Sequence, residues 1–149
     1  MAYIKGRHLN PERGEGYHGS FLGIADEALS ENDIVIAVGY SGDQIKFAKA
    51  DANAGGLRAG VMGVAKHDAA AGETVVILSH KLVKNVNASG GAGVGRPVYL
   101  SNTPGAWQTT EGEGVVIGSV LDAHASTGVV LLAPAKVQMG FDGDGDPMP

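Results

Sequence analysis

The sequence predicts a mainly β fold, a small antiparallel β-barrel or β-tulip with an extended N-terminal arm. Two stretches, residues 61–78 and 116–133, share one order of features: an apolar run, a small polar turn with His and Ala, a Gly, and a second apolar run. Such a unit is typical of a β-hairpin, and its repetition favours a compact barrel. A helix is plausible only around residues 26–29, with a turn at 68–71, because no longer segment keeps a helical period.

Composition is consistent with one soluble domain. The chain has 149 residues, enough to bury a hydrophobic core. Its 24 glycines and 6 prolines make it rich in turns, but below the level typical of low-complexity disorder. It has no cysteine, so neither disulfides nor thiolate metal sites are expected.

Charge and composition also argue against several partners. The net charge is −5 and the basic residues are scattered, so no nucleic-acid partner is expected. The few aromatic residues, 5% of the chain, make a stacking platform for bases or sugars improbable. No apolar run approaches the length of a membrane helix, and the N-terminus lacks the apolar core of a signal peptide. We therefore expect a protein without a membrane partner, made in the cytoplasm.

Residues 1–30 differ from the rest of the chain and are predicted to form an arm. They mix charges, glycines and isolated aromatics with no period of 3.6 or 2. One interpretation is a frayed terminus. The other is an arm that becomes ordered on a partner and uses its large side chains as anchors. The candidate contact residues are Tyr3, Ile4, Arg7, His8, Tyr17 and Phe21.

Residues 31–134 are predicted to form the β-rich domain. Residues 34–38 and 44–49 are expected to pair as a hairpin across a five-residue turn at 39–43. Further strands are expected at 57–65, 74–78, 79–86, 96–101, 106–110, 115–122 and 129–133. The uninterrupted apolar runs among them predict strands that are covered on both faces.

Two glycine- and acid-rich segments invite a ligand hypothesis. The loop at 89–95 could cradle a phosphate, but it leads into Pro97 and a strand rather than a helix, and it lacks the Gly-Lys-Ser/Thr sequence, so a hairpin loop is favoured. Asp142, Asp144 and Asp146 match the first ligands of a calcium loop, yet Pro147 occupies the position that requires Gly. We interpret residues 135–149 as a solvated acidic tail, with weak divalent-cation binding as the alternative.

The remaining polar residues predict no catalytic or metal site. None of the five histidines has metalloprotease spacing, and His67 and His124 occupy equivalent turns of the two similar stretches, where we interpret them as structural. No serine has the sequence context of a nucleophile. Trp107 follows a Pro-Gly turn and is either a core residue or an exposed contact. No enzyme activity and no cofactor are expected.

An ordered set of motifs in residues 57–134 resembles the capsid cement, or head-decoration, proteins of tailed bacteriophages. The motifs are residues 60–65 (Gly-Val-Met-Gly-Val-Ala), 69–76, 95–101 (Gly-Arg-Pro-Val-Tyr-Leu-Ser), 116–121 and 129–134. Each motif alone is weak, being mostly Gly and aliphatic residues, but their order and spacing are kept over about half of the chain. The first 30 residues and the acidic tail match no family pattern.

The resemblance implies a structural protein similar to the lambda head-decoration protein. Such a protein would bind the outer surface of the mature head as a homotrimer at three-fold and quasi-three-fold positions. It would contact the major capsid protein and stabilise the shell against internal DNA pressure. Residues 1–30, with Trp107 as a further trimer or capsid contact, are our candidates for binding. The alternative is a β-rich surface-binding module for host glycans or cell-surface adhesion.

Overall fold

The computed structural model describes residues 20–53, 61–90 and 93–134. Over these residues the fold is mainly β, as predicted, with ten strands and no helix. The strands are β1 (Ser20–Ala25), β2 (Ile34–Ser41), β3 (Gln44–Lys49), β4 (Met62–Ala65), β5 (Thr74–Leu78), β6 (Lys81–Val86), β7 (Pro97–Leu100), β8 (Trp107–Gln108), β9 (Val116–Asp122) and β10 (Gly128–Leu132).

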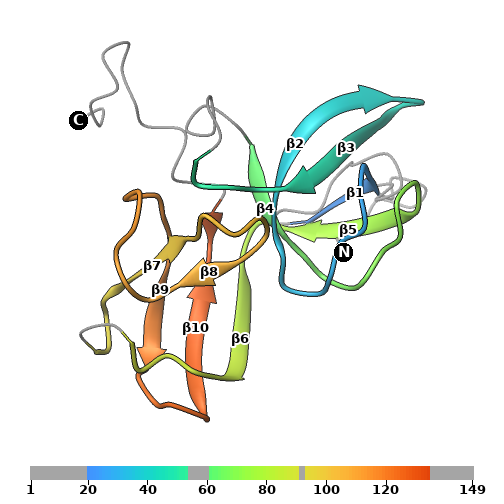
Figure 1. Cartoon of the computed structure of the whole chain (residues 1–149). Helices are drawn as coiled ribbons and strands as arrows, with labels where there is room; N and C mark the ends of the chain where they lie inside the picture. Colours follow the sequence, from blue (N-terminus) through green and yellow to red (C-terminus); the bar gives the residue numbers. More distant parts are fainter. Residues whose placement is uncertain (1–19, 54–60, 91–92, 135–149) are drawn as a thin grey trace, which may run out of the picture.

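The strands form two lobes rather than one barrel. Strands β1-β3-β2-β4-β5 close into a barrel, and β6-β10-β9-β7-β8 form a second, five-stranded sheet. Figure 1 shows the lobes side by side, with β4 between them. The pairs are antiparallel except that β1 runs parallel to β3, so the prediction of a wholly antiparallel barrel needs this one correction.

The two similar stretches each form a hairpin, but in different lobes. In the first, β4 pairs antiparallel with β5 in the barrel. In the second, β9 pairs antiparallel with β10 in the second sheet. The hairpin interpretation is therefore right for both stretches, and only the first of the two hairpins belongs to the closed barrel.

The barrel contains a different repeat, whose two copies lie forty residues apart in the sequence. Gly23 and Ala25 precede a turn and β2 in the same way that Gly63 and Ala65 precede a turn and β5. A Cβ at Gly23 would lie 2.7 Å from the Phe47 ring, and one at Gly63 would collide with the Ile77 side chain. Glycine is needed at both positions because the neighbouring strand approaches so closely.

The turns of this repeat bind each other through a reciprocal pair of backbone hydrogen bonds. Leu29 and Ala69 exchange backbone N–H···O=C bonds of 2.8 and 2.9 Å. Each turn is closed by a carboxylate, since Asp33 Oδ2 accepts from the Ser30 N–H at 2.8 Å and Glu73 Oε1 accepts from the Ala70 N–H at 2.7 Å. These bonds satisfy backbone groups that the short strands leave unpaired.

Three details of the N-terminal half differ from expectation. Residues 20–25, assigned to the arm, are β1, which pairs with both β3 and β5. Residues 26–29 form a turn and a bridge instead of a helix. The β2–β3 turn has two residues, Gly42 and Asp43, with φ values of 59° and 65°, which is the conformation that favours tight hairpins.

The barrel and the second sheet share one wall. In β2, Ile34 packs in a core with the second sheet, whereas the next residue, Val35, packs in the barrel core. Val64 and Ala65 of β4 divide in the same way, and all four are fully buried. Because successive residues of a strand point to opposite faces, β2 and β4 each bury both faces. This confirms the prediction of strands covered on both sides.

The turn between β7 and β8 joins the lobes by backbone hydrogen bonds. Gly105 accepts from the Ile34 N–H at 2.9 Å and donates to the Ala50 carbonyl at 2.8 Å, and Ser101 accepts from the Ala52 N–H at 3.1 Å. A Cβ at Gly105 would lie 3.0 Å from the Asp33 carboxyl group, and its φ is 81°. Only glycine fits this turn without strain.

Burial at this junction raises the pKa of Asp33 above its ordinary value of 3.8. The nearby carboxylates of Glu27 and Asp68 raise the pKa further, while the Ser30 N–H and the Lys49 ammonium group lower it. The folded protein therefore holds this proton more tightly than the unfolded chain. The free energy of unfolding should fall as the pH rises from 3.8 through the higher pKa of the folded state.

Replacing Ile34 with Ala should destabilise both lobes together. The change removes a fully buried side chain from the shared wall, and we expect a loss of about 2–5 kcal/mol in the free energy of unfolding. Urea unfolding would be followed by far-UV circular dichroism and by the fluorescence of Trp107, which is the sole tryptophan and lies in the second sheet.

The matched control is Val38→Ala, at an exposed position of β2, which should change stability by only about 0.5 kcal/mol. If Ile34→Ala shifts the circular dichroism transition but leaves the Trp107 transition in place, the two lobes do not share a cooperative wall.

Replacing Asp33 with Asn should stabilise the protein at neutral pH relative to low pH. Asn keeps an acceptor for the Ser30 N–H and removes the charge of this half-buried carboxylate. The free energy of unfolding of the variant, minus that of the wild type, should therefore increase as the pH rises from about 3 to about 7. Glu73→Gln, in the equivalent exposed turn, controls for the loss of a carboxylate. A difference that stays constant with pH would contradict the assignment.

Candidate functional site

Most residues of the predicted arm lie outside the part of the chain that the structure describes. Tyr3, Ile4, Arg7, His8 and Tyr17 lie outside the described residues. Phe21 is described, and it belongs to β1, where it is half-buried and pairs with Ile77 of β5. Phe21 is thus part of the barrel wall, and its side chain is not on a separate arm.

An exposed apolar group lies on the β2–β3 hairpin, which extends from the barrel (Figure 1). Val38 and Tyr40 are 52% and 68% exposed, and Val61 beside them is 54% exposed. Val61 is held there because its carbonyl accepts from the Ala37 N–H at 2.8 Å. Val38 lies where the β2–β3 register shifts, and such irregularities re-aim side chains. Exposed apolar groups of this kind mark contact surfaces.

A second exposed apolar group lies on the five-stranded sheet. Leu82 of β6 and both Val116 and Leu121 of β9 are exposed, and half-buried Leu131 of β10 pairs with Leu82 in register. Charged residues border this group, since Val129 pairs with Lys84 on one side and Asp122 on the other. An apolar centre with a charged rim is the usual composition of a protein–protein contact.

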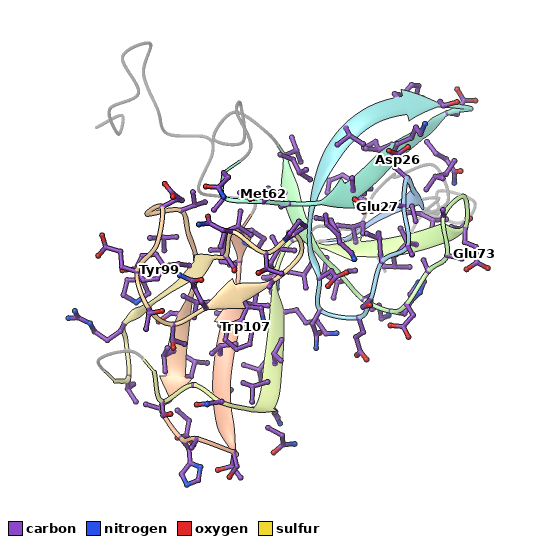
Figure 2. All side chains as sticks on the ribbon, viewed as in Figure 1. Asp26, Glu27, Met62, Glu73, Tyr99 and Trp107 are labelled. Atoms are coloured by element: carbon purple, nitrogen blue, oxygen red, sulfur yellow. The ribbon has the colours of Figure 1, made fainter. Side chains whose placement is uncertain are left out.

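Trp107 is half-buried and packs against the larger core cluster. Figure 2 shows Trp107 and Tyr99 in the lobe of the second sheet, whereas Glu73 lies on the barrel. The pairing of Trp107 with Leu100 of β7 places it on the inner side of the sheet. Part of its surface remains accessible, so its role as a trimer or capsid contact stays a prediction.

The two histidines in equivalent turns bind local backbone groups in separate lobes. His67 Nε2 accepts from the Val76 N–H at 3.2 Å, and its Nδ1 lies 2.9 Å from the Asp68 carbonyl. His124 Nδ1 lies 3.1 Å from the Ser126 amide nitrogen and accepts from it. Each ring closes its own turn, as a polar turn residue does.

The ligand hypotheses gain no support within the described part of the chain. Over residues 20–53, 61–90 and 93–134, no group of three acidic, histidine or cysteine residues is placed to hold a metal ion. Asp142, Asp144 and Asp146 lie outside this part. In the glycine-rich loop, Gly93 and Gly95 have positive φ and lead into β7. A helix that could span a membrane is likewise absent from the described residues.

Sequence reasoning missed the exposed apolar residues of both lobes. The signal was present in part, because Leu82 lies between the lysines of an edge strand and Tyr40 directly precedes a tight-turn sequence. Exposure itself depends on which strand pairs with which, and that is set by contacts far apart in the chain. Apolar residues in a strand are predicted to be buried by default.

Comparison with known proteins finds a matching family model and similarity to solved structures. A family model described as phage cement protein matches residues 40–135. The chain is also similar to a structure titled "The crystal structure of head fiber gp8.5 N base in bacteriophage phi29", with 19% identity, coverage of 76% of this chain and 92% of that chain, and a TM-score of 0.49. No curated protein matches the chain in sequence.

The family match is extensive. It begins at Tyr40, near the end of β2, and runs through β3–β10, so it includes strands of both lobes. It also includes the motifs on which the sequence resemblance rested. Since the match spans well over half of the sequence, the chain belongs to the phage cement protein family.

Proposed function

We propose that this protein binds the outer surface of the mature phage head as a homotrimer at three-fold and quasi-three-fold positions, where it contacts the major capsid protein and stabilises the shell against internal DNA pressure. The observation that carries the proposal is the family match over residues 40–135. Membership of this family supports a capsid-associated, virion-located and non-enzymatic role.

The architecture is consistent with a cement. The shared wall and the Gly105 junction join two β lobes, so force applied to one lobe is passed to the other through packed side chains. A protein that binds only the expanded lattice stabilises that lattice by mass action, by about 2.7 kcal/mol for each site at a concentration one hundred times its Kd. A trimer that binds three capsid subunits at once gains further overall affinity from multivalency.

The two exposed apolar groups provide surfaces for the two contacts that the proposal requires. We assign the group on the five-stranded sheet to contacts between copies, because its charged rim and apolar centre suit a protein–protein interface. We assign the projecting β2–β3 hairpin, together with the N-terminal segment that contains Tyr3, Ile4 and Tyr17, to the capsid. Isolated aromatic side chains serve as anchors in such contacts.

The purified protein should bind heads that lack it only after those heads have expanded. Binding to expanded and unexpanded heads would be compared by sedimentation, and the temperature at which DNA is released would be measured with and without the protein. We expect saturable binding to expanded heads and a higher release temperature. Equal binding to both forms, or an unchanged release temperature, would contradict a cement function. The mass in solution should correspond to three copies.

Deleting residues 2–19 should leave the fold intact and weaken capsid binding. The barrel closes through strands that begin at Ser20, so the thermal unfolding temperature should change little while head occupancy falls. Deleting residues 2–25 serves as the contrasting variant, because it removes β1 and opens the barrel between β3 and β5. Full occupancy of heads by the 2–19 deletion would refute the role of the N-terminal segment.

A further inference from the structure

A pocket of about 360 Å³ opens on the second lobe, beside β7 and β8. Pro97 and Tyr99 of β7 line it, together with Gly90, Arg96 directly before β7, and residues 109–111 of the loop after β8. Figure 2 shows Tyr99 in this part of the lobe, away from the barrel. None of these residues belongs to the exposed apolar groups described above.

The strand geometry orients the pocket-lining side chains. Val98 and Leu100 are fully buried in the core, so the alternating Pro97 and Tyr99 face the other side of the sheet. Tyr99 pairs with Gln108 of β8, whose Nε2 donates to the Thr110 carbonyl at 2.8 Å and fixes the loop.

Backbone contacts hold the remaining walls of the pocket. The Arg96 carbonyl accepts from the Val120 N–H at 2.9 Å. A Cβ at Gly90 would lie 2.8 Å from Thr109 Oγ1, so the turn that contains Gly90 approaches this loop closely. The pocket is therefore preformed, as ligand sites usually are.

The lining of the pocket combines two half-buried rings with charged and hydroxyl groups. Within the described residues, the Arg96 guanidinium, the Glu111 carboxylate and the Tyr99 hydroxyl make no hydrogen bond or ion pair. Arg supplies only donors, an ionised Glu supplies only acceptors, and Tyr, Thr109 and Thr110 hydroxyls supply both. These groups stand around two rings, Tyr99 and Pro97, that offer flat apolar surfaces.

We propose that this pocket binds one sugar residue of a glycan chain. A pyranose ring presents C–H groups on its face and hydroxyls around its edge. The face fits the Tyr99 and Pro97 surface, while the hydroxyls can donate to Glu111 and accept from Arg96. Because the pocket is open to solvent, the glycan can continue beyond it. The chain is poor in aromatic residues, but one half-buried tyrosine is sufficient for a single sugar.

Two other ligand classes fit these walls less well. A nucleotide would bring phosphates toward a chain of net charge −5. The pocket has only one arginine to attract them, and its positive charge is balanced by the Glu111 carboxylate. An extended peptide would add to a free sheet edge through its backbone, whereas β7, which lines this pocket, is already paired with β8 on one edge and with β9 on the other. Sugar binding here would be a second function, independent of capsid binding.

The test is a titration of the full chain, labelled with ¹⁵N, with four sugars: glucose, galactose, N-acetylglucosamine and glucuronic acid. We expect at least one to cause saturable amide shifts at Tyr99 and residues 109–111, with a Kd on the order of millimolar, since an open site contacts one side of a single sugar. Comparing glucose with glucuronic acid separates neutral from acidic specificity. The absence of saturable shifts with all four sugars would overturn the proposal.

Matched variants locate the binding. Tyr99→Ala and Glu111→Gln should each weaken the best sugar by about tenfold or more, because few contacts carry most of the affinity. Tyr99→Phe keeps the ring and should stay within a few fold of wild type. Tyr40→Ala removes an exposed tyrosine from the other lobe and should have no effect. If Tyr99→Ala does not fold, Glu111→Gln decides the question. Unchanged affinity in the folded pocket variants would contradict the site.

Discussion

Strands β2 and β4 bury side chains on both faces, and the rest of the structure depends on this shared wall. Ile34 and Val64 face the second sheet, and Val35 and Ala65 face the interior of the barrel. Neither lobe has a complete core without these two strands. The short link from β5 to β6 and the ion pair between Lys81 and Glu31, 3.1 Å long, cross the same boundary. Glu31 of this ion pair is exposed, so the pair adds little to stability, whereas burial of the apolar wall stabilises the junction between the lobes.

Sequence reasoning recovered what is local in this fold. Apolar runs and turn residues predicted a mainly β chain, the β2–β3 hairpin, and strands covered on both faces. The pairings that depend on distant residues could not be predicted. The parallel pairing of β1 with β3 and the division into two lobes are examples. Residues 20–30 were assigned to the arm because the buried positions Gly23 and Ala25 are small and give no hydrophobic period.

The candidate sites show the same division. The phage cement resemblance could be recognised because its motifs lie in order along the chain. The pocket proposed to bind a sugar could not, because Arg96, Tyr99 and Glu111 are ordinary residues that line one pocket only once β7 pairs with β8. The carboxylate of Asp33 was also missed, since its burial results from the docking of the turn that contains Gly105.

The two lobes allow a division of roles on the capsid. The projecting hairpin with Tyr40 belongs to the barrel, and the pocket with Tyr99 belongs to the second lobe. A protein that held the capsid with its barrel side would leave the part of the second lobe outside the contacts between copies able to meet external partners. The shared wall would fix the distance between these surfaces. Binding of the barrel to the capsid would therefore also orient the pocket.

A cryo-EM reconstruction of whole mature heads would test this account most directly. We predict density for three copies of the chain at each three-fold and quasi-three-fold position on the outer surface, with barrel and sheet joined as one body and the β2–β3 hairpin against the major capsid protein. Heads without density at these positions, or density in which the two lobes are separated, would contradict the account.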